Sequence, residues 1–193
     1  MKVNKIIKRI IKKHNVIAEN EWEHQYVSGR WEYLNELKEL ARYSLIIGYL
    51  NFFKPSGAIL DVGCGEGLLF ERMCSCSYTQ YVGIDISETA INKAIKKKNE
   101  KSSFLKTGLE NYSTNIMFDV IIFNEVLYYL EDPMRILKHY KTFLKDDGIF
   151  IISMYNTRKN IQLWKKIDSV YMLQDETKIS NKIGVSWTCK VYK

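Results

Sequence analysis

Three glycines at alternate positions, Gly63, Gly65 and Gly67, form the part of the sequence best suited to binding a ligand. They follow a short apolar run that contains Asp61, and a helical pattern begins at Leu68. Glycine tolerates the positive φ that a tight turn needs, and without a Cβ it lets the backbone touch a ligand. The helix that follows offers unpaired backbone N–H groups. The turn predicts a site for a nucleotide-like ligand, but such glycines also occur in purely structural strand-to-helix turns.

A second acid favours the ligand site over a purely structural turn. The apolar run over residues 81–86 predicts the next buried strand and contains Asp85, twenty positions after Gly65. An acid at that distance can accept hydrogen bonds from the hydroxyls of a ribose held over the turn. A dinucleotide site has the pattern G-x-G-x-x-G, whereas this turn has G-x-G-x-G. The Asp61 carboxylate would repel a pyrophosphate but suits a ligand that carries an ammonium group.

The stretch over residues 59–67 resembles the first motif of the class I S-adenosylmethionine (SAM) dependent methyltransferases. The resemblance implies that SAM is the cofactor and S-adenosylhomocysteine (SAH) the product. It implies that Asp61 and the glycine turn hold the methionine part of SAM, Asp85 its ribose and Ile86 its adenine. The residues expected in the turn are Gly63, Cys64, Gly65 and Gly67.

The adenine contact departs from the pattern of these methyltransferases. Many of them have an acid immediately after the third strand, where it bonds the adenine amino group. In this chain a short strand at residues 104–105 is followed by Gly108 at that place. We expect Glu110, or a backbone group near Leu109, to take over the contact.

A second motif lies at residues 118–133. Its apolar residues predict a central buried strand, and Asn124 and Glu125 follow at the carboxyl end, where open parallel sheets bind ligands. The motif is similar to the fourth-strand motif of the same methyltransferases, which implies that Asn124 lines the methionine end of the site. Many relatives have histidine at the position of Tyr129. The sequence of residues 125–130 resembles that of bacterial enzymes that methylate sugar amines, including the nodulation-type N-methyltransferases.

Three titratable residues are candidates for the chemistry: Glu125, Tyr129 and His24. Methyl transfer from a sulfonium is an in-line displacement, so catalysis consists mostly of alignment in a dry site. A sugar hydroxyl would need a base, whereas a neutral amine would need only orientation. We expect a small-molecule acceptor, with a sugar or sugar-derived metabolite of surface-polysaccharide biosynthesis as one candidate, and leave N- and O-methylation open. The alternatives are a SAM-binding subunit without catalysis, a nucleic-acid or protein methyltransferase, and a dinucleotide-binding domain.

The elements before the first strand must cover this site. A helix is predicted over residues 35–53 and stops at the turn over residues 54–57. Ahead of it lies a segment rich in aromatic residues, which in similar methyltransferases folds over the cofactor as a lid. Aromatic rings attract a sulfonium and exclude water. The rings expected in the lid are Trp22, Tyr26, Trp31 and Tyr33, of which Tyr26 and Trp31 are expected to touch the cofactor.

The predicted fold is α/β and Rossmann-like, with a mostly parallel seven-stranded sheet, helices on both faces and an N-terminal helical lid. Residues 1–193 are expected to form one methyltransferase domain, with the lid and extension in residues 1–56 and the SAM-binding core in residues 57–193. The later elements follow from periodicity and turn residues. They are helices over 134–144 and 158–167, a turn over 146–148, and strands over 149–153, 169–173 and 185–192.

Composition limits the class of protein. At 193 residues, with 46% hydrophobic and 13% aromatic content, the chain can form one good core. No apolar run approaches the roughly 18 residues needed to span a bilayer, so we expect a soluble cytoplasmic protein. The four cysteines show no zinc-binding spacing and are expected to form neither a metal site nor a disulfide.

The positive charge is concentrated at the start of the chain. Residues 1–19 form a basic amphipathic pattern whose six lysines and arginines account for most of the formal net charge of +7. Because the remainder is nearly neutral, we expect no nucleic-acid partner. An apolar stripe packed on the body or on a second subunit is favoured, while membrane contact and an arm for an acidic partner stay open. The oligomeric state does not follow from the sequence.

Overall fold

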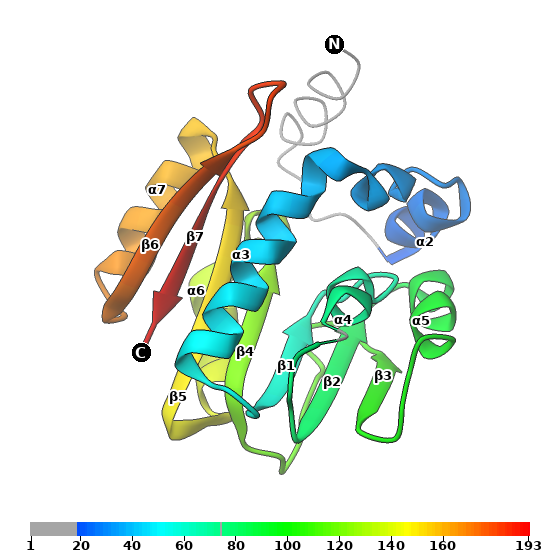
Figure 1. The fold of residues 1–193 in the computed structure, drawn as a ribbon, viewed down its shortest axis with the longest axis horizontal. Helices are drawn as coiled ribbons and strands as arrows, with labels where there is room; N and C mark the ends of the chain where they lie inside the picture. Colours follow the sequence, from blue (N-terminus) through cyan, green and yellow to red (C-terminus); the bar gives the residue numbers. More distant parts are fainter. Residues whose placement is uncertain (1–18, 74) are drawn as a thin grey trace.

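A single seven-stranded sheet organises the computed structural model, which describes residues 19–73 and 75–193. Its strand order is β3-β2-β1-β4-β5-β7-β6 (Figure 1). The strands are β1 (Ala58–Val62), β2 (Gln80–Asp85), β3 (Ser102–Lys106), β4 (Phe118–Asn124), β5 (Leu144–Tyr155), β6 (Leu173–Ser180) and β7 (Ser186–Tyr192). The pairings among β1 to β5 are parallel, whereas β7 is antiparallel to both β5 and β6. This is the predicted architecture.

Helices cover both faces of the sheet. Side chains of α3 (Leu37–Phe53), α4 (Leu68–Arg72) and α5 (Glu88–Ile95) pack with one set of alternate strand residues, including Ile59 and Ile122. Side chains of α6 (Pro133–Lys141) and α7 (Arg158–Asp168) pack with the other set, including Leu60 and Phe123. The alternation follows from the period of two along a strand, and both sets are apolar because the sheet is buried on both faces.

The segment before β1 forms the predicted helical cover. It consists of α2 (Glu19–Val27), the 3₁₀ helix η1 (Glu32–Asn35) and α3, and α2 lies at the end of the sheet where the parallel strands finish (Figure 1). A second 3₁₀ helix, η2 (Leu127–Tyr129), follows β4. The predicted basic segment lies outside the described residues except for Glu19. In the part of the chain that the structure describes, no helix is long and apolar enough to cross a membrane.

Two predicted elements in the C-terminal half of the chain, a strand and a turn, were wrong. Residues 169–172 do not form a strand but the turn that ends α7, and Val170 and Met172 there are exposed. The strand begins at Leu173 and is a mostly exposed polar edge, so it lacks the alternation on which the prediction depended. Asp146 and Gly148, expected in a turn, lie within β5, where the pairing with β4 shifts register.

We expect Gly83→Ala to destabilise the fold by about 1–3 kcal/mol, the usual cost of overpacking a core. A Cβ at this β2 position would lie 2.6 Å from Cδ1 of Phe104 and 2.9 Å from Sγ of Cys64. The matched control is Gly48→Ala in α3, where a Cβ would meet no atom within 4 Å. The control should stabilise the helix by about 0.5–1 kcal/mol. Urea unfolding of both variants gives the comparison, and equal midpoints would contradict the packing argument.

Candidate active site

The glycine turn connects β1 to α4 and has the conformation that its sequence predicts. Gly63, Gly65 and Gly67 have φ values of +74°, +55° and +72°. The N–H groups of Gly63 and Cys64 both donate to the carbonyl of Ile84, at 2.8 and 2.9 Å, which fixes the turn against β2. A Cβ on Gly63 would lie 2.5 Å from a methyl of Val126, and one on Gly65 would lie 2.8 Å from the hydroxyl of Tyr26. Side chains are thus excluded from the turn by both backbone and space.

A cavity of about 450 Å³ lies over this turn, at the carboxyl ends of β1, β2 and β4. It brings together nearly every residue that the sequence analysis singled out. The predicted residues that line it are Tyr26, Trp31, Asp61, Gly63, Cys64, Gly65, Asp85, Ile86, Leu109, Glu110, Asn124, Glu125 and Tyr129.

Two predicted site residues do not reach the cavity. His24 lies on α2 but is exposed and does not line the cavity, so the structure does not bring it together with the other candidates for the chemistry. Gly67 caps α4 and faces Ala94 of α5, where an added Cβ would come within 3.2 Å of the alanine methyl. Its glycine is required for helix packing rather than for contact with the cavity.

Asp61 is a buried carboxylate with one oxygen left without a hydrogen-bond partner. Its Oδ2 accepts a hydrogen bond of 2.5 Å from the hydroxyl of Tyr81 on β2, whereas Oδ1 has no partner. Burial raises the pKa of Asp61 to about 7, an effect that the Tyr81 hydrogen bond opposes and the negative charge of Asp85 reinforces. A buried acceptor without a donor, on the wall of a cavity, fits the ammonium group of SAM.

Asp85 ends β2 and joins three elements at the other side of the turn. Its Oδ2 accepts from the N–H of Gly65 and its Oδ1 from the N–H of Ser87, both at 2.9 Å. Burial raises the pKa of Asp85 to about 6, while these backbone donors lower it. The carboxylate is therefore held in a fixed orientation at the cavity wall.

The groups expected to replace the missing adenine acid are already engaged. The carbonyl of Leu109 accepts a hydrogen bond of 2.9 Å from Tyr140, and the carboxylate of Glu110 forms an exposed ion pair of 2.9 Å with Arg135. Asn111, which sequence reasoning missed, also lines this part of the cavity and lies beside Gly108. Its amide can both donate to and accept from an adenine edge.

The loop after β4 holds Glu125 in a strained conformation with φ of +64°, which is uncommon for a residue other than glycine. Three donors fix its carboxylate: Tyr128 Oη at 2.8 Å, Ser153 Oγ at 3.0 Å and the N–H of Tyr155 at 3.0 Å. Burial raises the pKa of Glu125, and Arg42 and these donors oppose the rise. With three donors in place, the carboxylate is a structural anchor more than a free base.

Arg42 of α3 is the main site residue that the sequence did not reveal. Its guanidinium, only 2% exposed, donates to Oδ1 of Asn124 and forms a 3.1 Å ion pair with Glu39. It also lies 5.9 Å from the ring centroid of Trp187 on β7. Its Nε is buried without a partner, and the residue lines the cavity. An unsatisfied buried donor of this kind suits an anionic group of a ligand.

Aromatic side chains of the cover form a cluster over the cavity, as predicted. Trp22 stacks on Trp31 with ring centroids 5.7 Å apart and meets Tyr129 of η2 edge-on at 5.0 Å. Tyr26 and Tyr33 lie 6.2 and 6.1 Å from Trp31. The cluster thus joins α2 and η1 to the loop after β4.

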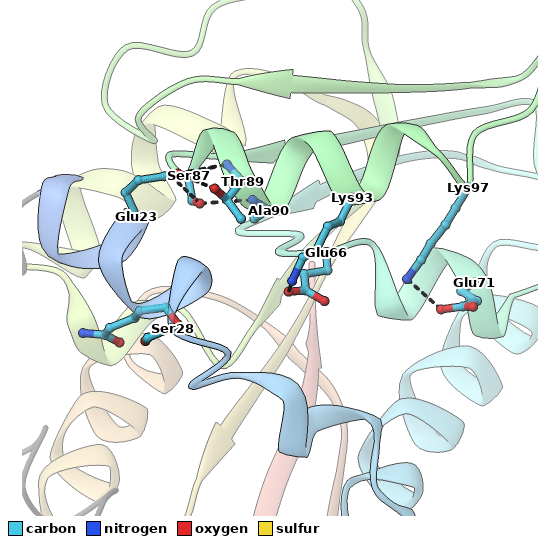
Figure 2. Close-up of polar contacts among 10 residues, drawn as sticks. Glu23, Ser28, Glu66, Glu71, Ser87, Thr89, Ala90, Lys93 and Lys97 are labelled. Carbon is cyan, nitrogen blue, oxygen red and sulfur yellow. Dashed lines mark hydrogen bonds and ion pairs between the residues drawn. The ribbon is translucent and has the colours of Figure 1, made fainter.

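A group of polar contacts holds α2 to the start of α5 (Figure 2). The carboxylate of Glu23 accepts hydrogen bonds from the hydroxyls of Ser87 and Thr89 and from the N–H of Thr89. These are groups at the start of α5, where a carboxylate is stabilised by the helix dipole. Glu19 adds an ion pair of 2.6 Å with Lys106.

We expect Asp61→Asn to raise the melting temperature of the ligand-free protein. Since the folded pKa of Asp61, about 7, exceeds the unfolded value, protonation stabilises the native state below the unfolded pKa. That stability is lost as pH rises from about 4 to about 7, and asparagine avoids the loss. The gain should therefore be small at pH 4.5 and reach several degrees at pH 8, measured by thermal unfolding. A constant difference across this range would contradict the pKa assignment.

Comparisons with known proteins identify the family. The family model described as a methyltransferase domain matches residues 31–182. The chain is 28% identical over 175 residues to a ubiquinone biosynthesis O-methyltransferase of Rickettsia typhi, covering 89% of this chain and 70% of the relative. It is 27% identical over 183 residues to the protein of that name from Pelagibacter ubique, covering 89% and 75%.

Solved structures share the fold at low sequence identity. The N-methyltransferase NodS from Bradyrhizobium japonicum WM9, in complex with SAH, gives a TM-score of 0.71 at 18% identity and covers 97% of this chain and 96% of its own. The magnesium protoporphyrin IX methyltransferase ChlM from Synechocystis PCC 6803, with bound SAM, gives 0.67 at 17% identity and covers 96% and 88%. The protein therefore belongs to the methyltransferase domain family and is a class I SAM-dependent methyltransferase.

Proposed function

We propose that the protein methylates a nitrogen or oxygen atom of a small-molecule acceptor, with sugar-derived metabolites as the first class to test. The observation that supports this most is the lining of the cavity, which combines the glycine turn with aromatic rings of α2, of the segment after it and of the loop after β4. Such a chamber suits a small acceptor better than a polymer. The relatives named above include both an O- and an N-methyltransferase, so both acceptor atoms remain candidates.

Three charged side chains are suited to binding SAM. Asp61 would accept from its ammonium group through the unpartnered Oδ1, and Arg42 would donate to its carboxylate through Nε. Asp85 would accept from the ribose hydroxyls, exchanging its bond to the Gly65 N–H for them. Ile86, Leu109 and the amide of Asn111 would surround the adenine. When bound, SAM supplies an electrophilic methyl group, and the protein must align it and exclude water.

The acceptor would lie beyond Asn124, between the aromatic cover and the loop after β4. Burial raises the pKa of Tyr129 to about 12, so its phenol keeps its proton and acts as a hydrogen-bond donor and a wall. Glu125 would hold the loop through Tyr128 and β5. Because neither side chain is a free base, Glu125 and Tyr129 would orient the acceptor rather than take its proton.

The experiment that tests the proposed function measures SAH formation from SAM with a panel of nucleotide sugars, amino sugars and other small metabolites. Asp85→Ala should weaken SAH binding by about 1.5–3 kcal/mol, the usual worth of hydrogen bonds to a charged group. Isothermal titration with SAH, and with NAD as a negative control, gives this difference. Unchanged SAH affinity in a folded Asp85→Ala protein would contradict the ribose contact, and NAD binding would contradict the choice of cofactor.

We expect Glu23→Gln to speed the exchange of bound SAH, because the contact in Figure 2 fastens α2 to α5 while Trp22 and Tyr26 of the same helix line the cavity. The glutamine loses the charge that the start of α5 stabilises, and its amide has one acceptor oxygen where the carboxylate has two, so part of the donor set is left without an acceptor. Stopped-flow displacement should show SAH dissociating several-fold faster. Glu71→Gln is the matched control, since it removes an exposed ion pair between Glu71 of α4 and Lys97, just after α5, that is also drawn in Figure 2. Equal dissociation rates for both variants would contradict the role of Glu23.

A further inference from the structure

Glu39, on the first turn of α3, is a buried carboxylate that none of the sequence motifs contains. It is 4% exposed and lines the cavity. Its Oε2 accepts from Arg42 at 3.1 Å, and the described residues provide this carboxylate with no other hydrogen bond. The ion pair with Arg42 offsets the cost of burying this charge, while the other carboxylate oxygen, Oε1, receives no hydrogen bond from the described residues.

The position of Glu39 is at the acceptor end of the cavity. Its partner Arg42 donates to Asn124, at the end of β4, through Nη1 and to Glu39 through Nη2. Burial raises the pKa of Tyr33 and of Tyr155, and the negative charge of Glu39 adds to both shifts. Both tyrosines line the cavity, together with Tyr129 and Trp187. Glu39 therefore contributes a negative charge to a chamber whose walls are aromatic.

None of the other groups considered for the chemistry offers a free negative charge to an acceptor. His24 is outside the cavity, the Glu125 carboxylate already has three donors, and the Tyr129 phenol keeps its proton. At the acceptor end of the cavity, Tyr33 lies in the field of the negative Glu39 and Glu125 and the positive Arg42. Tyr129 lies in the field of Glu125, Arg42 and Arg30, which belongs to the cover. A SAM carboxylate on Arg42 would offset its charge and leave the chamber negative.

We propose that Glu39 binds the acceptor and selects an amine, an inference that rests on the proposed methyltransferase function. Its carboxylate accepts a hydrogen bond from the N–H of a neutral amine and directs the nitrogen lone pair at the methyl carbon. As the N–C bond forms, the C–S bond breaks and its electron pair stays on sulfur. The nitrogen thereby becomes a cation, which leaves as an ammonium and loses its proton to solvent. Carboxylate and aromatic rings both stabilise that positive charge.

The test compares two probes of the same shape, choline and its neutral isostere 3,3-dimethyl-1-butanol, on the full chain saturated with SAH. Isothermal titration should show choline binding about tenfold tighter to the wild type. Glu39→Gln should bring the two affinities together, measured with SAH kept saturating for each variant. Glu39→Asp keeps the negative charge but moves it one methylene group back from the cavity, so this variant should still prefer choline, by a smaller factor. Glu36→Gln is the control, because Glu36 is a carboxylate on the same helix start that is exposed and paired with Lys38.

Equal affinity of the two probes for the wild type would overturn the proposal, as would a full choline preference in Glu39→Gln. If Glu39→Gln does not fold, an unchanged preference in Glu39→Asp overturns it and a reduced one supports it. Failure of the wild type to bind SAH would instead contradict the proposed function. SAH binding without a preference for choline contradicts only the role of Glu39.

Discussion

The buried guanidinium of Arg42 connects the helical cover to the centre of the sheet. Nothing in α3 other than this side chain carries a positive charge into the cavity, among the residues described, and its hydrogen bond to Asn124 reaches the end of the central strand. A buried cation must be matched, and Glu39 and the nearby Glu125 supply the negative charge. The position of α3, and with it the aromatic segment ahead of it, thus depends on a polar contact made at the active site itself.

The sheet and the glycine turn were predictable because both follow from local rules. Buried parallel strands appear as apolar runs such as residues 118–123, and the positive φ of Gly63 and Gly65 is signalled by glycine itself. The edge strand β6 was misplaced because an exposed antiparallel edge carries no such run. Asp61 and Asp85 could be assigned to the site because the strands that carry them end at the same edge of the sheet.

Residues brought by tertiary packing could not be assigned in the same way. Arg42 and Glu39 lie in a helix whose sequence shows only amphipathic spacing, and the hydrogen bond that joins Arg42 to Asn124 spans 82 positions. The exposed position of His24 was not predictable for a related reason. It lies two positions from both Trp22 and Tyr26, and the face that α2 turns inward is decided by Trp31, Tyr129 and the start of α5. A weakly amphipathic nine-residue helix does not reveal that face in its sequence.

The buried carboxylates of the site lower the stability of the ligand-free protein. Asp61 and Asp85 are both buried, with pKa values raised to about 7 and about 6, so each costs free energy when ionised and unpaired. Hydrophobic residues at these places would avoid that cost but would also remove the acceptors proposed for the ammonium group and the ribose hydroxyls of SAM. Since SAM carries both an ammonium and a sulfonium, its binding offsets the cost that the fold bears without it. The fold is therefore most stable when the site is filled, and the same burial that weakens the empty protein strengthens each electrostatic contact to the ligand.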